Sequence, residues 1–357
     1  MAPNFTRAGR WFLRSGIQES GGGVARYYRI DLERNSPVST EITGYALSAL
    51  LYLHSVTGEN EYFNRALAAA RFLTRSAWDG HALPFEFSPG PDGRFTYFFD
   101  TGIVVRALLA AHAATNDPVY QSTAETLGRN MARDFHNHNG DYHPVLALPG
   151  KEAVLHEPGR WSRTPGCYQL KAALGWWNLF EATGDPSFRK LYENVLHTSL
   201  ETWDSFLPGH PDRAKVVDRL HAFLYFLEGM LPRVNLKRCA TTIRAGIARV
   251  SEIARDAAPE FERSDVYAQL LRVRIYAHQA GAARLDVTAA AREAAILTGF
   301  QTSSEDPRID GGFYFGRKAG VWLPYVNPVS TAFAVQALDL WQRFRDGGSA
   351  THPSLLI

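Results

Sequence analysis

Apolar residues in this chain gather into long stretches, which alternate with stretches that mix apolar and charged residues. Residues 42–53, 102–111 and 170–177 are almost wholly apolar, whereas charged residues recur through 63–75. A helix that is apolar on all sides is buried, and a helix with a charged face lies against solvent. The pattern therefore predicts buried helices that alternate with amphipathic ones.

A repeated turn separates the two kinds of helix. Thr57, Thr115 and Thr183 are each followed by Gly or Asn and then by Asp or Glu. Gly suits the left-handed position that ends a helix, and Pro after an acidic residue suits the first turn of the next helix. Less regular copies follow, so the sequence predicts six helical hairpins. Their first helices are expected to begin near residues 41, 98, 165, 219, 264 and 328.

Six hairpins predict an all-α fold, the (α/α)6 toroid. The stretch 4–16 reads as a helix without a partner of its own, and it would supply the missing outer helix of the sixth hairpin. No linker-like composition interrupts the chain. We therefore expect residues 1–357 to form one toroid domain, in which the N-terminal helix closes the ring beside the C-terminal helix.

Four connections are much longer than the hairpin turns, at residues 17–40, 77–98, 136–161 and 301–326. Each leads to the start of an inner helix, so all four would lie on one face. Long connections in a compact domain are commonly functional, and we place the site on that face. The residues expected to bind substrate there are Glu19, Trp78, Glu86, Trp161, Gln169, Tyr267, Asp310, Tyr314, Arg317 and Asn327.

Two carboxylates, Glu41 and Asp100, begin neighbouring inner helices. A pair of carboxyls can cleave a glycosidic bond, one as the acid and the other as the base. Three aromatic residues, 97–99, precede Asp100, and burial among them would raise its pKa and keep it protonated. Both residues also have a purely structural interpretation. Asp is a preferred N-cap, and a Glu in the first turn gains from the helix dipole.

The overall composition narrows the possible partners. The formal net charge is +2, and the sequence has no concentrated basic stripe of the kind that binds nucleic acid. We expect no nucleotide cofactor, because neither a P-loop nor GxGxxG occurs. Cys167 and Cys239 are too few for a disulfide framework or a zinc cluster. His136, His138 and His143 lack the spacing of a metal motif, so no metal is expected.

The distribution of apolar residues also predicts where in the cell the protein is found. No run of about 18 apolar residues predicts a membrane span. The first residues lack the apolar core of a secretory signal, so the sequence favours a cytoplasmic protein. The oligomeric state is left open, as are the sugar and the linkage on which an enzyme of this kind would act.

The segment FFDTG, residues 98–102, is similar to the His-Asp-x-Gly segment that carries a catalytic Asp in unsaturated glucuronyl hydrolases. These belong to the six-hairpin glycosidase-like superfamily. Asp100 and Gly102 match, Phe99 replaces the His, and the next hairpin begins without that family's second Asp. The segments 310–313 and 326–338 also resemble helical toroids met among polysaccharide biosynthesis genes, and glucuronyl C5-epimerases have a related toroid. The resemblance implies a toroid that acts on saccharides. No DxDD motif of terpene cyclases occurs.

Three functions remain open at this point. The leading hypothesis is a glycoside hydrolase that acts on an oligo- or polysaccharide, with the two carboxylates as acid and base. The alternative is a uronate epimerase or lyase, in which Tyr325, Tyr267 or His221 removes a proton beside a carboxylate held by Arg317. The third is a toroid that binds glycans without turning them over. A fold by itself does not choose among these functions.

Overall fold

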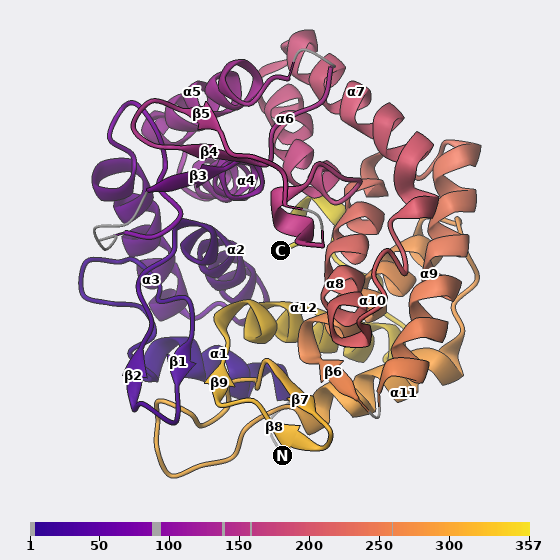
Figure 1. The fold of residues 1–357 in the computed structure, drawn as a ribbon. Helices are drawn as coiled ribbons and strands as arrows, with labels where there is room; N and C mark the ends of the chain where they lie inside the picture. Colours follow the sequence, from indigo (N-terminus) through magenta and orange to yellow (C-terminus); the bar gives the residue numbers. More distant parts are fainter. Residues whose placement is uncertain (1–3, 88–93, 138–139, 158, 259) are drawn as a thin grey trace. The chain divides into compact units, whose positions relative to one another are not determined.

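The protein is described by a computed structural model that covers residues 4–87, 94–137, 140–157, 159–258 and 260–357 (Figure 1). Contacts divide the chain into two compact units. Unit 1 comprises Met1–Ile17, Tyr27–Arg34 and Asp204–Ile357, and unit 2 comprises Gln18–Arg26 and Asn35–Trp203. Each unit is built from helical hairpins.

Unit 2 contains three hairpins. Their first helices are α2 (Thr40–Thr57), α4 (Phe98–Thr115) and α6 (Gln169–Thr183), and their second helices are α3 (Asn60–Phe72), α5 (Pro118–Asp134) and α7 (Pro186–Thr202). Each second helix packs on the first helix of its own hairpin, and α4 packs against both α2 and α6. The first helices are buried over most of their length, as their apolar sequences predict.

The hairpin turns have the predicted chemistry. Gly58, Asn116 and Gly184 end the first helices with positive φ angles of 73°, 57° and 74°. Asp117 and Asp185 are N-caps, since their side chains accept from the backbone two residues later, and a proline follows each of them. The tight turns are thus fixed by local sequence alone.

Helices α4 and α6 approach each other closely because glycine lines their contact. A Cβ atom on Gly102 would lie 2.4 Å from the Ala172 carbonyl oxygen. A Cβ atom on Gly175 would lie 3.0 Å from the Gly102 carbonyl oxygen. The glycine of the FFDTG segment therefore has a packing role. Helix α4 is also long and apolar enough to cross a membrane, but 67% of it is buried inside the protein, as in the core helices of globular proteins.

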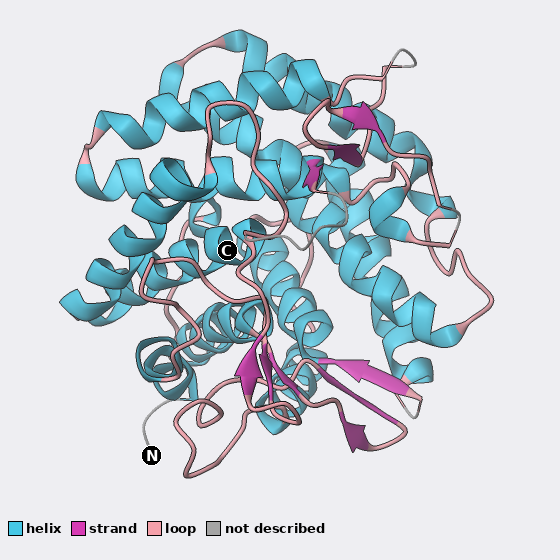
Figure 2. Ribbon diagram, turned by 60° about the vertical axis from the view of Figure 1, so that its left-hand side comes forward, coloured by secondary structure: helices cyan, strands magenta, loops and turns pink. Residues whose placement is uncertain are grey.

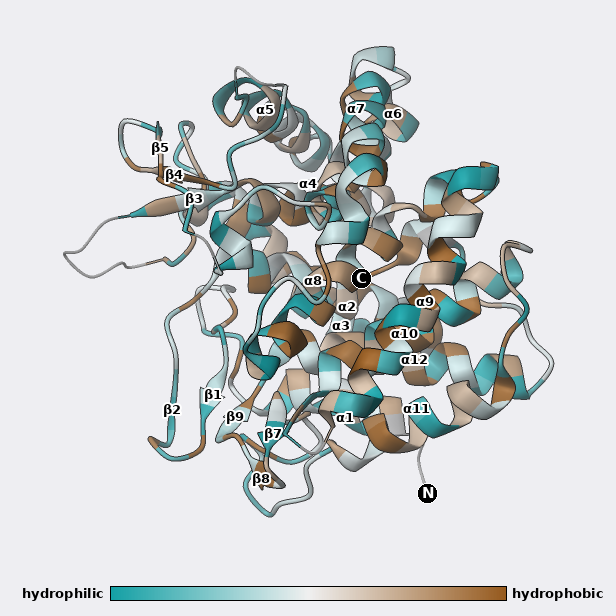
Figure 3. Ribbon diagram, turned by 45° about the vertical axis from the view of Figure 1, so that its right-hand side comes forward, coloured by the Kyte–Doolittle hydropathy of each residue, from teal (hydrophilic) through white to brown (hydrophobic). Residues whose placement is uncertain are grey.

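Unit 1 contains the remaining helices. They are α1 (Asn4–Arg14), α8 (Arg213–Gly229), α9 (Lys237–Ala257), α10 (Ser264–Gln279), α11 (Val287–Gly299) and α12 (Pro328–Arg345). Helix α10 packs against α8 and α12, while α1 packs against α12. Figure 3 shows hydrophilic and hydrophobic residues mixed along α9, whose buried residues recur at helical spacing. Its arginines therefore belong to an amphipathic helix that buries one face.

Two predicted helix starts were wrong. Helix α8 begins at Arg213, earlier than the predicted start near 219, because the Asp212 side chain accepts a hydrogen bond from the Ala214 N–H and caps the helix there. Helix α6 begins at Gln169, later than the predicted start near 165. Pro165 and Gly166 precede it in irregular backbone.

The long connections, expected to be irregular, contain three small sheets with strand orders β2-β1-β9, β3-β4-β5 and β6-β7-β8 (Figure 2). The strands are β1 (Tyr28–Arg29), β2 (Arg34–Asn35), β3 (Phe95–Tyr97), β4 (Val145–Ala147), β5 (Glu152–Ala153), β6 (Phe261–Arg263), β7 (Gly316–Lys318), β8 (Val321–Trp322) and β9 (Tyr325–Val326). Short helical turns are η1 (Leu73–Ala77), η2 (Trp161–Arg163), η3 (Trp203–Ser205), η4 (Leu231–Arg233) and η5 (Pro353–Leu355). Strands β3 and β6 run directly into α4 and α10 and so fix where these helices begin.

Candidate functional site

The two predicted catalytic carboxylates occupy equivalent places in unit 2. Glu41 lies in the first turn of α2 and Asp100 in the first turn of α4, and these two helices pack together. Asp100 is 6% exposed, and its Oδ2 atom has no hydrogen-bond partner among the described residues. Glu41 is half-buried. A buried carboxyl oxygen without a partner is costly and needs an explanation.

The pKa values of both carboxyls are raised, and Glu41 contributes to the shift of Asp100. Burial raises the pKa of Glu41 to about 7. Burial also raises the pKa of Asp100 well above its usual range, and the nearby charge of Glu41 raises it further. The Arg26 guanidinium opposes both shifts but does not cancel them. Because both pKa values are raised, the pair can present a protonated acid beside an ionisable base at a higher pH than two ordinary carboxyls would.

Neither carboxylate caps its helix. Ser39 is the N-cap of α2 and accepts a hydrogen bond from the Ile42 N–H at 3.4 Å. The N-cap of α4 is Tyr97, whose side chain makes no capping bond, and Asp100 lies three residues further on. The interpretation of Asp100 as an N-cap is therefore wrong, and its burial serves no capping purpose.

The aromatic residues near the start of α4 fall into two groups. Phe98 belongs to the core, where its ring stacks on Tyr142 at 5.0 Å between ring centroids. Burial raises the pKa of the Tyr97 and Tyr168 phenols, and the charge of Asp100 adds to both shifts. The start of α4 is therefore a desolvated, aromatic setting for Asp100.

Four further residues of unit 2 were expected to bind substrate, and the structure shows what each of them contacts or how exposed it is. Glu86 lies 3.6 Å from the Arg26 guanidinium, so both are near the carboxyl pair. Trp161 packs its ring edge-to-face with Tyr168 at 5.1 Å. Trp78 is half-buried at the end of η1, and Glu19 is exposed in a turn.

Gln169 has a structural role. Its Nε2 donates to the Tyr142 carbonyl at 3.0 Å, and its Oε1 accepts from the Gly166 N–H at 3.2 Å. The side chain is 6% exposed and holds the backbone just before α6. These bonds use both ends of the amide, so substrate contact by Gln169 remains a prediction that the geometry does not favour.

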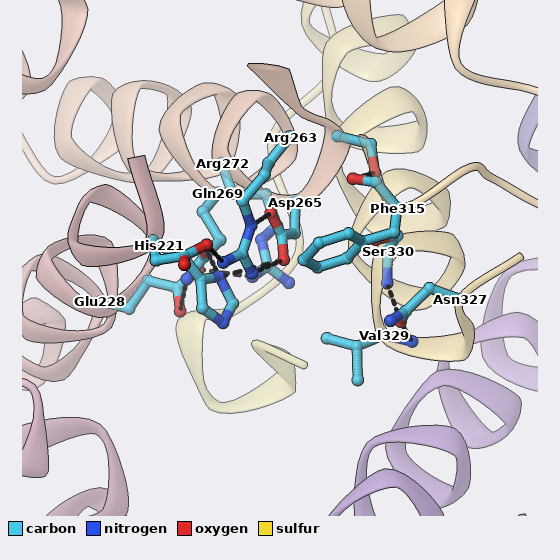
Figure 4. Close-up of polar contacts among 12 residues, drawn as sticks. His221, Glu228, Arg263, Asp265, Gln269, Arg272, Phe315, Asn327, Val329 and Ser330 are labelled. Carbon is cyan, nitrogen blue, oxygen red and sulfur yellow. Dashed lines mark hydrogen bonds and ion pairs between the residues drawn. The ribbon is translucent and has the colours of Figure 1, made fainter. Parts of the chain in front are cut away.

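Unit 1 holds a second cluster, built around His221 of α8 (Figure 4). Its Nδ1 atom lies 2.7 Å from Gln269 Oε1 and 3.3 Å from Asp265 Oδ2. Asp265 accepts two hydrogen bonds from Arg263, at 3.0 and 2.5 Å, and burial of this ion pair is nearly complete. Burial lowers the pKa of His221 to about 4 despite the opposing charge of Asp265. The imidazole is therefore neutral at physiological pH.

The cluster continues away from His221 into the core. Gln269 Nε2 lies 3.5 Å from Glu228 Oε2, and Glu228 Oε1 lies 2.5 Å from Arg272. Both Glu228 and Arg272 are fully buried. Arg272 also donates to Gln336 at 3.1 Å. Although Glu228 lies at the end of α8, its side chain is thereby connected to His221 through Gln269.

Three predicted residues of unit 1 form an aromatic and charged group. Tyr314 stacks on Trp322 with ring centroids 4.8 Å apart. Arg317 lies over the Trp322 ring at 5.5 Å, and its Nε donates to Glu262 at 2.5 Å. Tyr267 also donates to Glu262, at 3.0 Å. Because Glu262 already pairs with Arg317, a substrate carboxylate would have to compete for that guanidinium.

The last predicted residues of unit 1 serve the fold. Asn327 is the N-cap of α12 and accepts from the N–H groups of Val329 and Ser330 at 2.8 and 3.1 Å. Asp310 pairs with Arg7 at 2.6 Å and so ties its loop to α1. The phenol ring of Tyr325 lies beneath the Arg29 guanidinium at 5.1 Å. Among the residues that the structure describes, no hydrogen bond joins the Tyr325 hydroxyl to a group that could take its proton, so its role as a base remains a prediction.

Sequence reasoning missed Arg26, Arg263 and Asp265. One signal was present: Asp265 lies in the first turn of α10, the same place that Glu41 and Asp100 occupy in their helices. Among the described residues no group of three or more His, Cys, Asp or Glu side chains could hold a metal. His138, considered for such a group, lies outside the described residues.

Comparisons with known proteins identify the fold. No protein-family model and no curated protein sequence matches the chain. A sugar epimerase from a ruminal bacterium has 13% identity and a TM-score of 0.72 over 96% of each chain. The cellobiose 2-epimerase of Bacillus thermoamylovorans B4167 has 13% identity and a TM-score of 0.68 over 94% of this chain and 98% of that chain. An α-amylase from Clostridium perfringens has 14% identity and a TM-score of 0.64 over 95% and 98%.

At this identity the likeness shows the fold alone. The chain has the all-α (α/α)6 toroid fold, which confirms the fold class expected from the hairpin pattern.

Proposed function

We propose that the protein is a carbohydrate-active enzyme that hydrolyses glycosidic bonds, with Asp100 as the acid and Glu41 as the base. The observation that carries the proposal is the buried Asp100 carboxyl at the start of α4, with an oxygen that has no partner among the described residues and with the charge of Glu41 raising its pKa. A soluble scaffold gains nothing from burying a carboxyl whose oxygen has no partner. Such an arrangement is typical of a site where a substrate supplies the missing contact.

The roles follow from burial. Asp100 is the more buried carboxyl, and both burial and the charge of Glu41 raise its pKa, so we assign it the role of the acid. A protonated Asp100 can donate to the leaving glycosidic oxygen. Glu41, which ionises near pH 7, can then accept a proton from the attacking water. Arg26 and the two phenols would surround the developing charges.

The test is a turnover screen of neutral and uronate oligosaccharides in water enriched in oxygen-18. Hydrolysis predicts cleavage products that carry one heavy oxygen at the new reducing end. Products lighter by one water would indicate a lyase, and unchanged substrate with every glycan would remove the support for an enzyme. The third outcome would favour a toroid that only binds glycans.

A second candidate is a proton-transfer reaction, such as epimerisation or isomerisation of a sugar, with His221 as the base. The specific observation is the Nδ1 atom of His221 between two acceptors, which leaves the other ring nitrogen as the proton-accepting one. Two of the solved structures with this fold are sugar epimerases. The discriminating test is deuterium uptake into uncleaved sugar in D2O, which hydrolysis does not produce.

A further inference from the structure

The side chain of Gln269 connects His221 to a buried ion pair. Its Oε1 lies 2.7 Å from the imidazole Nδ1, and its Nε2 lies 3.5 Å from Glu228 Oε2. Gln269 is fully buried on α10, so both ends of its amide are shielded from bulk solvent and need partners in the protein interior (Figure 4). The direction of this amide therefore decides which kind of group the imidazole meets.

The ion pair fixes that direction. Glu228 is held by Arg272 at 2.5 Å in a fully buried setting, and an ionised carboxylate only accepts hydrogen bonds. The amide nitrogen of Gln269 must point at Glu228, because the opposite orientation would place two acceptor oxygens together. The carbonyl oxygen of the amide is then left facing His221.

The Nδ1 atom of the His221 imidazole therefore lies beside two hydrogen-bond acceptors. Gln269 Oε1 is the nearer, and Asp265 Oδ2, kept ionised by Arg263, lies 3.3 Å away. A ring nitrogen between two acceptors carries the hydrogen, so the other nitrogen bears the lone pair. A reversed Gln269 would instead present an N–H donor to Nδ1 and would favour the opposite tautomer.

From this geometry we propose that Glu228 is a positioning residue, which sets the tautomer of His221 through Gln269. Arg272 serves the same purpose one step further away, by keeping Glu228 ionised and in place. For its effect on turnover the inference rests on the second candidate function, proton transfer at His221. The tautomer itself does not depend on any activity.

The test is nitrogen-15 NMR of the intact chain with labelled histidine rings, assigned to His221 by comparison with a His221→Gln variant. In the wild type, Nδ1 is expected to show the shift of a protonated nitrogen and Nε2 that of an unprotonated one between pH 6 and 8, about the range where an unperturbed histidine would titrate. Observation of the Nε2–H tautomer in the wild type would overturn the inference, whatever the activity screens give.

Glu228→Gln removes the carboxylate but leaves Arg272 without its charge partner. The double variant Glu228→Gln, Arg272→Met avoids that buried unpaired charge and is the second test protein. Both should show a mixture of His221 tautomers, because a neutral amide at 228 accepts either orientation of Gln269. A tautomer ratio unchanged from the wild type in a folded variant would contradict the role of Glu228.

The matched control is Arg274→Lys, which alters another buried ion pair of α10, with Glu293, without touching this relay. It should leave the His221 tautomer unchanged. If proton transfer at His221 is detected, the double variant should lower kcat in proportion to the wrong tautomer, with KM unchanged. If no such activity exists, the NMR result still decides the positioning role.

Discussion

Glu41 and Asp100 lie in the first turns of two helices that pack together, and the charge of Glu41 raises the pKa of Asp100. Two carboxyls in this relation resist simultaneous ionisation. Ionisation of the pair at neutral pH therefore lowers the free energy of unfolding.

The first prediction concerns the pH dependence of turnover. A base with a pKa of about 7 must lose its proton to act, so kcat/KM should fall as the pH drops below about 7. It should fall again at higher pH, where Asp100 ionises. Rates measured across this range with one oligosaccharide check the profile. A flat profile between about pH 5 and about pH 9, about two units either side of neutrality, would exclude Glu41 as the base.

The second prediction concerns stability. Between its unfolded pKa of 4.5 and its folded value of about 7, Glu41 is protonated in the native state and ionised in the unfolded state. The native state then binds more protons, so this group lowers the free energy of unfolding as the pH rises through that window. Glu41→Gln should stabilise the protein by about 1–3 kcal/mol at pH 8.

The same variant should have almost no effect at pH 4.5, where Glu41 is protonated in the folded protein. Urea unfolding at both pH values measures the difference. The matched control is Glu61→Gln, an exposed carboxylate in the first turn of α3, which should not stabilise the protein at either pH. Equal effects of the two substitutions would show that Glu41 is not strained by its surroundings.

The third prediction separates packing from chemistry at Gly102. Gly102→Ala places a Cβ atom 2.4 Å from the Ala172 backbone oxygen, so α4 and α6 must move apart. We expect a loss of about 1–3 kcal/mol in the free energy of unfolding, the usual cost of overpacking. Gly299→Ala, at the end of α11 with no atom within 4 Å of its Cβ, is the control and should be nearly neutral. Similar losses for both would contradict the packing role.

The fourth prediction addresses the second cluster. Arg263→Met leaves Asp265 buried without its ion-pair partner, which should cost about 3–5 kcal/mol of stability. Arg308→Met breaks a solvent-accessible ion pair with Asp306, and it should cost far less than Arg263→Met because exposed ion pairs are screened by water. Thermal and urea unfolding compare the two. A small loss for Arg263→Met would mean that Asp265 becomes protonated at little cost.

The hairpins were predictable because their signals are local. A glycine or asparagine in a left-handed turn, followed by an acidic cap, needs only a few neighbouring residues to act. The start of α8 was missed because Asp212 was not recognised as the cap of that helix. The small sheets were missed because pairs such as Glu262 with Arg317 are far apart in the sequence.

The site was only partly predictable for a related reason. A carboxylate at a helix start was a usable signal for Glu41 and Asp100, but their pKa values depend on how α2 and α4 pack. Asn327 gave the same kind of signal, yet the structure uses its side chain to cap α12. The burial of Glu228 follows from helix packing in unit 1, and no local pattern reveals it.

The most direct test of the central claim compares turnover by wild type, Asp100→Asn, Glu41→Gln and the control Glu61→Gln. Each protein is incubated with neutral and uronate oligosaccharides, and the products are weighed by mass spectrometry. We predict cleavage fragments that have gained water from the wild type and from Glu61→Gln, and no such fragments from the other two variants. Full hydrolysis by a folded Asp100→Asn or Glu41→Gln variant would contradict the assignment of this carboxyl pair as the catalytic acid and base.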